Sequence, residues 1–543
     1  MGTQNLEKQI IYQIYPKSFK DTNGDGIGDL KGIIEQLDYL QELGITMIWL
    51  TPIFKSPDRD NGYDVADYLK INDEFGSMQD FDSLVMEAGK RSIFIMLDMV
   101  FNHTSDQHEW FLKSEQRIEP YDNFYIWRDG RNGLPPSKGE ASFGGSVWEF
   151  DEKRQQYYYH SFDKSQPDLN WAEPKVREKL YEVVNFWINK KVRGFRFDSI
   201  DSIGKKVADT VRIDSQLTHE YLKEMRAHTY GTDDRIITVG ETGLAKVADA
   251  QKYTNSENGE FSMIFQFELM NIDGVRSGNW EKRAIPLTEL KENIVKWQTD
   301  LFNSGWSGQF LGSHDFPRIV SRFGNDSAKY RVLSAKMLAS FLFGLQGTPY
   351  IYQGDEIGMT NYPWRSIHDF RDVESLNVFK KLIAKGLDPK EALKRLSDSS
   401  RDNARTPMQW SAGKNAGFSD HDPWIAVNPN YLQVNADNNG KDQEPIFDYY
   451  KKLIMLRKQN AVFNDGNFKL LLPEQKNIFA YKRSNADDEI VVLTNFSAEE
   501  IDLGNDYPAL KTSRIILSNY HDRYSSAHHN AIIRPYEALW IRQ

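Results

Sequence analysis

Gly194-Phe195-Arg196-Phe197-Asp198 is the stretch that decides the fold of this chain, because it has the pattern of a short buried strand ending on a carboxylate. Two other apolar runs end in the same way, on Glu241 and on Asp315. A carboxylate at the tip of a buried strand is held by rigid backbone and still faces a pocket, as in barrel enzymes. Each could instead cap a following helix, but Arg196 beside one and His314 beside another indicate a shared site.

Short apolar runs alternate with amphipathic helical patterns along the chain. The runs predict strands at 10–16, 47–52, 94–100, 194–198, 236–241, 263–268, 308–315 and 348–354. Helical periodicity appears at 32–43, 78–91, 174–190, 219–229, 287–302 and 329–345. Strands joined by helices form parallel sheets, and eight such units close a (β/α)₈ barrel. The predicted fold class is therefore α/β, a (β/α)₈ TIM barrel.

Two connections are too long for ordinary loops. Residues 104–170, after the third strand, predict a small inserted B domain, and residues 355–445, after the eighth, predict a second excursion over the same rim. Strand patterns at 468–473, 478–484, 489–497, 513–519 and 531–542 then predict a C-terminal antiparallel β-sandwich. We expect the catalytic barrel at 1–103 and 171–462, with the inserted domain at 104–170 and the C-terminal β domain at 463–543.

Composition excludes several classes of protein. The formal net charge of −11 argues against a nucleic-acid or anionic-membrane partner. The chain has no cysteine, so it uses neither disulfides nor thiolate chemistry. No apolar run approaches the roughly 20 residues of a membrane span. Residues 1–8 lack the apolar stretch of a secretory signal, and Leu6 does not fit the myristoylation pattern, so we expect a cytoplasmic protein. A monomer and a homo-oligomer both fit.

The stretch from Asp21 to Asp29 predicts a cation site. Asp21, Asn23, Asp25 and Asp29 alternate with glycines that permit a tight wrap, as in the front half of a calcium loop. The stretch lacks the closing glutamate and the preceding helix of an EF-hand, and an acidic loop without metal is the alternative. We expect Ca²⁺, or alternatively Mg²⁺, in a structural role because the loop precedes the first helix.

Several segments resemble the signature regions of the α-amylase superfamily, glycoside hydrolase family 13. The segments are Gln13-Ile14-Tyr15-Pro16, Asp98 to His103, Gln166-Pro167-Asp168-Leu169-Asn170, Gly194 to Asp198, Glu241, and His314-Asp315. The resemblance covers nearly the whole chain. Gln166 to Asn170 is similar to the mark of the oligo-1,6-glucosidase subgroup. Arg401 to Trp410, Phe143 to Ser146 and Gln353 to Met359 are typical of α-glucosidases in that subgroup.

This resemblance implies a role for each matching residue. Asp198 would be the nucleophile, Glu241 the general acid/base, and Asp315 the holder of the sugar's 2- and 3-hydroxyls. Arg196 would keep Asp198 ionised. The other implied roles concern substrate and metal: His103 and His314 bind hydroxyls, Tyr63 forms a stacking floor, Asp60 and Arg405 pair across the non-reducing end, Phe143, Phe162 and Gln166 line the pocket, and Ile27 adds its carbonyl to the metal loop. No organic cofactor is required.

Three positions depart from the family pattern. Ser313 stands where most relatives have asparagine, and Phe316 replaces the usual glutamine or leucine on the leaving-sugar side. Ser199 follows the nucleophile, where valine accompanies α-1,6 preference in the family and alanine or threonine accompanies α-1,4 preference. Serine removes the bulk of valine, so the sequence does not indicate a strict oligo-1,6-glucosidase.

The resulting hypothesis is a retaining, exo-acting α-glucosidase that releases glucose from the non-reducing end of short α-glucosides, α-1,4 and/or α-1,6 linked. A nucleophile and an acid about 5–5.5 Å apart would retain the anomeric configuration. An α-glucosyltransferase and a trehalose-6-phosphate hydrolase are the alternatives. A non-catalytic amylase-like binding subunit is disfavoured, because all three carboxylates are in place. The expected partner is a small oligosaccharide, not a nucleic acid or a membrane.

Overall fold

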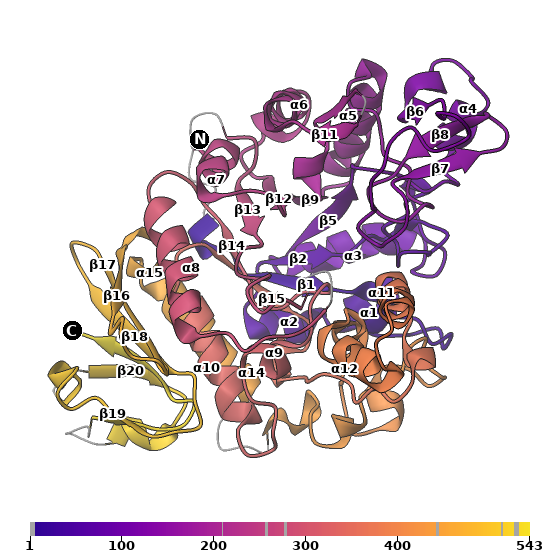
Figure 1. Cartoon of the computed structure of the whole chain (residues 1–543). Helices are drawn as coiled ribbons and strands as arrows, with labels where there is room; N and C mark the ends of the chain where they lie inside the picture. Colours follow the sequence, from indigo (N-terminus) through magenta and orange to yellow (C-terminus); the bar gives the residue numbers. More distant parts are fainter. Residues whose placement is uncertain are drawn as a thin grey trace.

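Eight parallel strands form the barrel in the computed structural model, which describes residues 6–208, 210–255, 259–275, 280–440, 445–511, 514–525 and 531–543. The strands are β1 (Ile11–Ile14), β2 (Met47–Leu50), β5 (Phe94–Val100), β9 (Gly194–Asp198), β12 (Ile237–Thr242), β13 (Met263–Gln266), β14 (Gly308–Gln309) and β15 (Thr348–Tyr352). Their order is β13-β12-β9-β5-β2-β1-β15-β14, and a parallel bridge between Ile264 and Ser307 joins the two ends. The predicted (β/α)₈ barrel is confirmed (Figure 1).

Two apolar cores hold the barrel together. The first fills its interior with residues that alternate along the strands, such as Trp49, Met96, Val239 and Phe265, because side chains two apart share a strand face. The second lies between the strands and the surrounding helices. These helices are α1 (Leu30–Glu35), α2 (Leu37–Leu43), α3 (Met78–Lys90), α5 (Pro174–Asn189), α6 (Ser215–His228), α7 (Val247–Thr254), α8 (Leu287–Asp300), α9 (Ile319–Phe323) and α10 (Arg331–Phe343).

The connection from β5 to α5 carries its own small sheet. It contains α4 (Glu109–Glu115) and the antiparallel strands β6 (Trp127–Arg128), β8 (Gln156–Tyr159) and β7 (Trp148–Asp151), in that spatial order. Two further ribbons flank the barrel: β3 (Phe54–Lys55) with β4 (Asp67–Ile71), and β10 (Lys205–Val207) with β11 (Val211–Ile213).

The connection after β15 is mainly helical. It carries α11 (Val373–Ala384), α12 (Pro389–Ser399) and α13 (Asp402–Arg405), and leads to α14 (Ile446–Gln459) and α15 (Val462–Asp465). Asn377 Nδ2 on α11 donates to Phe143 O at 3.1 Å, so the two long connections meet over the barrel. The division of the chain into domains at 104–170 and 463 stays a prediction.

Single turns of 3₁₀ helix complete the connections. They are η1 (Leu6–Lys8), η2 (Pro16–Ser18), η3 (Tyr121–Asn123), η4 (Ile200–Ser202), η5 (Tyr230–Thr232), η6 (Asp355–Ile357), η7 (Ile367–Asp369), η8 (Lys414–Gly417), η9 (Pro429–Leu432), η10 (Asp437–Gly440), η11 (Pro508–Lys511) and η12 (His521–Ser525). Of these, η4 directly follows Asp198 and Ser199 and therefore bears on the predicted site.

The C-terminal part is an antiparallel sheet with two covered faces. Its strands, in spatial order, are β16 (Asn467–Leu471), β17 (Ile478–Ser484), β18 (Glu489–Asn495), β22 (Ala538–Arg542) and β20 (Arg514–Ser518). One face packs on α10, where Trp540 Nε1 donates to Ser340 O at 3.2 Å. The other is covered by Leu503 and by the ribbon of β19 (Ile501–Asp502) and β21 (Ile532–Ile533), through the buried side chain of Ile533. Residue 513, the first of a predicted strand, lies outside the described residues.

One strand is shorter than predicted. β14 ends at Gln309, so Asp315 sits in the loop six positions beyond it and not at a strand tip. The loop is still fixed, because Phe310 and Leu311 are buried and Arg405 Nε donates to His314 O at 3.1 Å. Asp315 therefore reaches the barrel mouth on an anchored loop.

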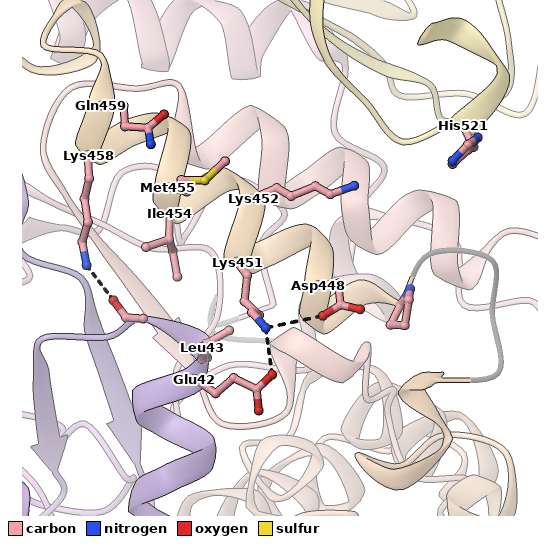
Figure 2. Close-up of a pocket in the computed structure, with 12 residues that line it drawn as sticks. Glu42, Leu43, Asp448, Lys451, Lys452, Ile454, Met455, Lys458, Gln459 and His521 are labelled. Carbon is pink, nitrogen blue, oxygen red and sulfur yellow. Dashed lines mark hydrogen bonds and ion pairs between the residues drawn. The ribbon is translucent and has the colours of Figure 1, made fainter. Parts of the chain in front are cut away.

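A cavity of 770 Å³ lies away from the predicted site, between the end of α2 and α14 (Figure 2). Lys451 crosses it, with Nζ 2.8 Å from Glu42 Oε1 and 3.8 Å from Asp448 Oδ1. Leu43, Ile454 and Met455 provide apolar walls. No predicted site residue lines this cavity, so the volume of a cavity does not by itself identify the active site. Within the part of the chain that the structure describes, no helix is long and apolar enough to cross a membrane.

Candidate active site

Arg196, in the middle of β9, holds carboxylates from three adjacent strands. Its Nη1 donates to Asp98 Oδ1 at 2.6 Å and to Asp198 Oδ1 at 2.7 Å. Its Nη2 lies 2.8 Å from Glu241 Oε2. Asp98 on β5 pairs in register with Arg196, while Asp198 and Glu241 lie one layer nearer the carboxyl ends of β9 and β12. The predicted contact of Arg196 with Asp198 is present, and the same guanidinium bridges Asp198 to Glu241.

Burial sets the protonation of these two carboxyl groups. It raises the pKa of Glu241 to about 8, against the favourable charge of Arg196 and with reinforcement from Asp198. It also raises the pKa of Asp198 to about 6, again opposed by Arg196. Because both acids share one guanidinium, the second ionisation is the harder one. Between these two values Asp198 is charged while Glu241 keeps its proton, which is the pairing that a nucleophile and an acid need.

Ser199 turns the chain sharply at the end of β9. Its backbone is left-handed, with φ 42° and ψ 36°, a region that residues other than glycine rarely occupy. In this turn the Ser199 N–H donates to Glu241 Oε2 at 2.8 Å, and the hydroxyl lies 3.4 Å from the same oxygen. The residue after the predicted nucleophile therefore holds the predicted acid.

His314 is neutral and oriented by its neighbours. Burial lowers its pKa to about 3. Nδ1 lies 2.7 Å from Gln13 Nε2, which assigns the hydrogen to Nε2, 2.6 Å from Tyr63 OH. The Tyr63 hydroxyl in turn donates to Asp98 Oδ2 at 2.9 Å, and its ring stacks on His314 at 5.4 Å. Tyr63 is thus tied to both the imidazole and the Arg196 cluster.

His103 belongs to the same polar network from the opposite side. Burial lowers its pKa to about 4, so it is also neutral. Its Nε2 lies 3.1 Å from Tyr63 O and 3.2 Å from Gln166 Nε2. Gln166 Nε2 donates to Asp60 Oδ2 at 3.0 Å. The two histidines, expected to converge on one ligand, both contact Tyr63.

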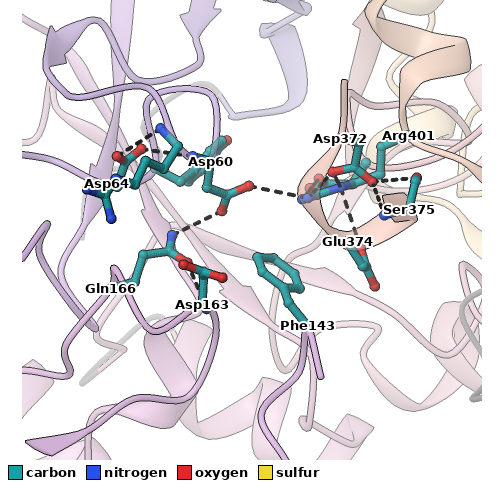
Figure 3. Close-up of polar contacts among 12 residues, drawn as sticks. Asp60, Asp64, Phe143, Asp163, Gln166, Asp372, Glu374, Ser375 and Arg401 are labelled. Atoms are coloured by element: carbon teal, nitrogen blue, oxygen red, sulfur yellow. Dashed lines mark hydrogen bonds and ion pairs between the residues drawn. The ribbon is translucent and has the colours of Figure 1, made fainter. Parts of the chain in front are cut away.

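The predicted ion pair between Asp60 and Arg405 is wrong, because Asp60 pairs with Arg401 (Figure 3). Arg401 Nη2 lies 3.3 Å from Asp60 Oδ1 and 2.5 Å from Asp372 Oδ1. Arg405 is fully buried, and its Nη2 lies 3.5 Å from Asp315 Oδ1. Arg401 caps the start of α13 and Arg405, four positions later, is its last residue, so the two share a face and the sequence does not show which one reaches the pocket.

Phe143 forms a wall beside this ion pair. The Arg401 guanidinium carbon lies 5.0 Å from the centre of the Phe143 ring (Figure 3). The Phe162 ring packs against Phe143 with its centre 5.5 Å away. Asn377 fixes the Phe143 carbonyl. The wall is therefore built from the β5–α5 connection and held by residues of the connection after β15.

A cavity of 460 Å³ brings most of the predicted residues together. Among them, the polar lining consists of Asp60, Asp198, Ser199, Glu241 and Asp315, and the ring lining consists of Tyr63, His103, Phe143 and Phe162. Four predicted residues, Gln166, Arg196, His314 and Arg405, lie behind this surface and contact the groups that form it.

Sequence reasoning missed part of the lining, namely Ser142, Gly243, Phe267, Asn271, Glu374 and Arg401. Arg401 begins the 401–410 motif and could have been found there. Phe267 lies near the end of the predicted strand 263–268, which is a weaker signal. Glu374, at the start of α11, had no motif, yet its Oε2 lies 3.5 Å from Arg401 Nε. The missed residues come mainly from irregular connections.

The loop from Asp21 to Asp29 is tightly wound. Asp21 Oδ1 accepts the Asn23 and Gly24 N–H groups at 3.0 and 2.8 Å, and Oδ2 accepts the Gly26 N–H and the Ser419 hydroxyl. Among the described residues no group of three or more His, Cys, Asp or Glu side chains is placed to hold a metal ion. The donors offered by Asp21, Asn23 and Asp25 are hard oxygens, which fit Ca²⁺ or Mg²⁺ in kind.

Paired carboxylates at the mouth of a (β/α)₈ barrel define the class of protein as a glycoside hydrolase. The alpha amylase catalytic domain model matches residues 13–466. An oligo-1,6-glucosidase of Parageobacillus thermoglucosidasius is 46% identical over 98% of each chain. Isomaltulose synthase of Erwinia rhapontici NX5 is 39% identical with a TM-score of 0.93, and a variant of Bacillus licheniformis trehalose-6-phosphate hydrolase is 42% identical with a TM-score of 0.92, each over 99% of both chains. The chain belongs to the α-amylase family, glycoside hydrolase family 13.

The two carboxyl groups should give a bell-shaped pH dependence of kcat/KM on an aryl α-glucoside. Activity should fall below a pKa of about 6, where Asp198 gains a proton, and above about 8, where Glu241 loses one. Glu241→Gln should remove the basic limb on a substrate with a good leaving group, because that leaving group needs no proton. A basic limb that survives in Glu241→Gln would assign it to another group.

Proposed function

We propose that this enzyme is a retaining, exo-acting α-glucosidase that releases glucose from the non-reducing end of short α-glucosides. One observation carries the proposal: the carboxyl pair of Asp198 and Glu241 lines a cavity whose wall includes the Asp60–Arg401 ion pair. A site closed in this way accepts a chain end and not the middle of a polymer. Faster cleavage of internal bonds in long dextran or amylose than of disaccharides would contradict the proposal.

The reaction assigned to these residues has two steps. Asp198 attacks the anomeric carbon and forms a glucosyl ester while Glu241 gives its proton to the departing oxygen. Water then attacks the same carbon, transfers a proton to Glu241, and releases glucose and the Asp198 carboxylate. Two inversions return the original configuration. Arg196 contacts one oxygen of each carboxyl group and so contributes to their relative placement.

The side chains on the opposite wall fit the recognition of sugar hydroxyls. His103 lines the cavity and is neutral, so it has one ring nitrogen that donates and one that accepts, whereas His314 lies behind the surface and orients Tyr63. Asp60 and Arg401 supply a charged acceptor and a charged donor at the closed end. Asp315, 3.4 Å from Arg401 Nη1, completes the set of groups proposed to hold the glucose.

Transfer of glucose to a second sugar is the alternative within the same chemistry. Phe316 and Phe267 line the cavity with their rings 6.1 Å apart, which gives the proposed acceptor side an apolar wall. A wall of this kind favours a sugar face over water. The similarity to an isomaltulose synthase is consistent with this alternative. Product analysis at high maltose concentration separates the two, because hydrolysis yields only glucose whereas transfer also yields longer or rearranged sugars.

Trehalose-6-phosphate is the alternative substrate. A trehalose-6-phosphate hydrolase of Escherichia coli is 44% identical over 98% of each chain, so overall similarity does not separate the substrates. A comparison of the turnover of trehalose-6-phosphate with that of maltose, isomaltose and sucrose separates them. The cytoplasmic location and the oligomeric state stay predictions from the sequence.

Replacing either carboxyl group should end hydrolysis. Asp198→Asn removes the nucleophile and Glu241→Gln removes the proton donor, so turnover of maltose should fall by several orders of magnitude. Both variants should keep the fold, since the amides are isosteric, and circular dichroism checks this. Near-wild-type activity in a clean preparation of either variant would exclude the assigned role.

Ser199 should set linkage preference. Ser199→Val adds bulk against an α-1,4-linked leaving sugar, whereas the extra methylene of an α-1,6 link lets that sugar move away. Relative kcat/KM should shift from maltose toward isomaltose by roughly tenfold to two-hundredfold, corresponding to about 1–3 kcal/mol. Ser199→Ala, which removes the hydroxyl without adding bulk, should leave the ratio close to that of the wild type.

The turn at Ser199 affects stability in the same experiment. A β-branched residue at φ 42° is strained by on the order of 1–3 kcal/mol, so Ser199→Val should also lower the melting temperature. Linkage preference is therefore tested by the ratio of kcat/KM for maltose to that for isomaltose, and not by total activity. An unchanged ratio would mean that Ser199 does not face the leaving sugar.

We propose that Asp21, Asn23, Asp25, Asp29 and the Ile27 carbonyl hold a structural Ca²⁺. Added Ca²⁺ should raise the melting temperature, by the equivalent of about 2.7 kcal/mol when its free concentration is a hundred times its Kd. Asp25→Asn should weaken this effect, and Asp487→Asn, in a distant exposed turn, should not. An identical melting temperature in Ca²⁺, Mg²⁺ and chelator would contradict the proposal.

A further inference from the structure

Asp201 is a buried carboxylate that the proposed reaction does not use. It lies in η4, three residues after Asp198, and is 6% exposed. Its Oδ2 accepts the backbone N–H of Leu244 at 2.7 Å. Leu244 comes three residues after Glu241, in the turn that leaves β12. The carboxylate therefore links the segment that follows the proposed nucleophile to the segment that follows the proposed acid.

This bond has a reciprocal partner. The Ser199 N–H donates to Glu241 Oε2 at 2.8 Å, from the turn after β9 to the side chain on β12. The Leu244 N–H donates to Asp201 Oδ2, from the turn after β12 to the side chain after β9. Each turn thus gives a backbone hydrogen to a carboxylate of the other. This reciprocal pair of hydrogen bonds clamps the two turns together.

At Leu244 the turn after β12 is held by this clamp and not by packing. Leu244 is 62% exposed, so its side chain does not anchor the backbone. Toward the neighbouring strand β13, the end of β12 is held by Thr242, whose Oγ1 donates to Phe265 O at 3.0 Å. The bond to Asp201 is the matching anchor toward β9. Asp201 is itself fixed, because its carbonyl oxygen lies 3.4 Å from Thr218 Oγ1 on α6.

We infer that Asp201 is a positioning residue that sets where the Glu241 carboxyl stands relative to Asp198, and hence how well it protonates the leaving group. This inference rests on the proposed function. Loss of the bond would let the turn after β12 relax while β9 and the Asp198–Arg196 contact stay in place. Proton donation by Glu241 would become slower, whereas nucleophilic attack by Asp198 would be unaffected. A displacement near 1 Å in such a group costs about a hundredfold in rate.

The test compares leaving groups that differ in their need for a proton. In Asp201→Ala, kcat/KM on phenyl α-glucoside should fall about tenfold to a hundredfold. On 2,4-dinitrophenyl α-glucoside, which leaves unaided, it should change by less than about threefold. Asp201→Asn keeps an oxygen that accepts from Leu244 and should retain the wild-type dependence on the leaving group. Asp214→Ala removes the N-cap of α6, where Asp214 accepts from Leu217 N, and should lower stability without changing that dependence.

Equal losses on both substrates in Asp201→Ala, or no loss on either, would overturn the inference. If Asp201→Ala does not fold, Asp201→Glu keeps the charge and displaces the acceptor by one methylene, and the same comparison applies to it. The proposed function fails differently: the wild type would then release no glucose from any aryl α-glucoside. An active wild type with an inactive Asp198→Asn and a uniform loss in Asp201→Ala would exclude the positioning role alone.

Discussion

Arg196 is the constraint on which the site depends. A single guanidinium, buried inside the barrel, contacts carboxylates from β5, β9 and β12. Its guanidinium carbon lies 5.3 Å from the centre of the Trp49 ring and 5.9 Å from that of Tyr63, so the side chain has little freedom to move. Removing one member of a buried charge cluster commonly costs about 3–5 kcal/mol, because the remaining charges lose their partner. The geometry of catalysis and the stability of the barrel interior therefore rest on the same side chain.

The balance of charge at the barrel mouth explains its chemistry. Three arginines, Arg196, Arg401 and Arg405, face a larger number of carboxylates, so the acids cannot all ionise. Burial raises the pKa of Asp60 to about 7, although Arg401 opposes this, while contacts with both Arg401 and Arg405 hold Asp372 ionised. A pocket that is short of positive charge also suits a transition state in which the sugar ring becomes positive.

The regular part of the structure could be predicted from the sequence, and the irregular part only in outline. Strand patterns located the barrel, and Asp198 and Glu241 followed because strand tips fix their side chains. The sequence predicts Asp315 at a strand tip, although β14 ends at Gln309. Buried loop residues such as Phe310 have the same apolar pattern in the sequence as the residues of a strand. The sequence does not distinguish Arg401 from Arg405 as the partner of Asp60, because the two arginines share one helical face. Glu374 was missed because nothing local distinguishes a helix start that faces a pocket from one that faces water.

The ion pair between Asp60 and Arg401 joins residues 341 positions apart. During synthesis Asp60 leaves the ribosome long before its partner, by roughly 17 to 70 seconds at about 5–20 residues per second. From the synthesis of Glu241 until that of Arg401, the nascent chain has both members of the carboxyl pair but lacks the cation that closes the pocket. Completion of the binding site is therefore a late event of biosynthesis, and a chain released before α13 would be an open barrel with an unbalanced acidic mouth.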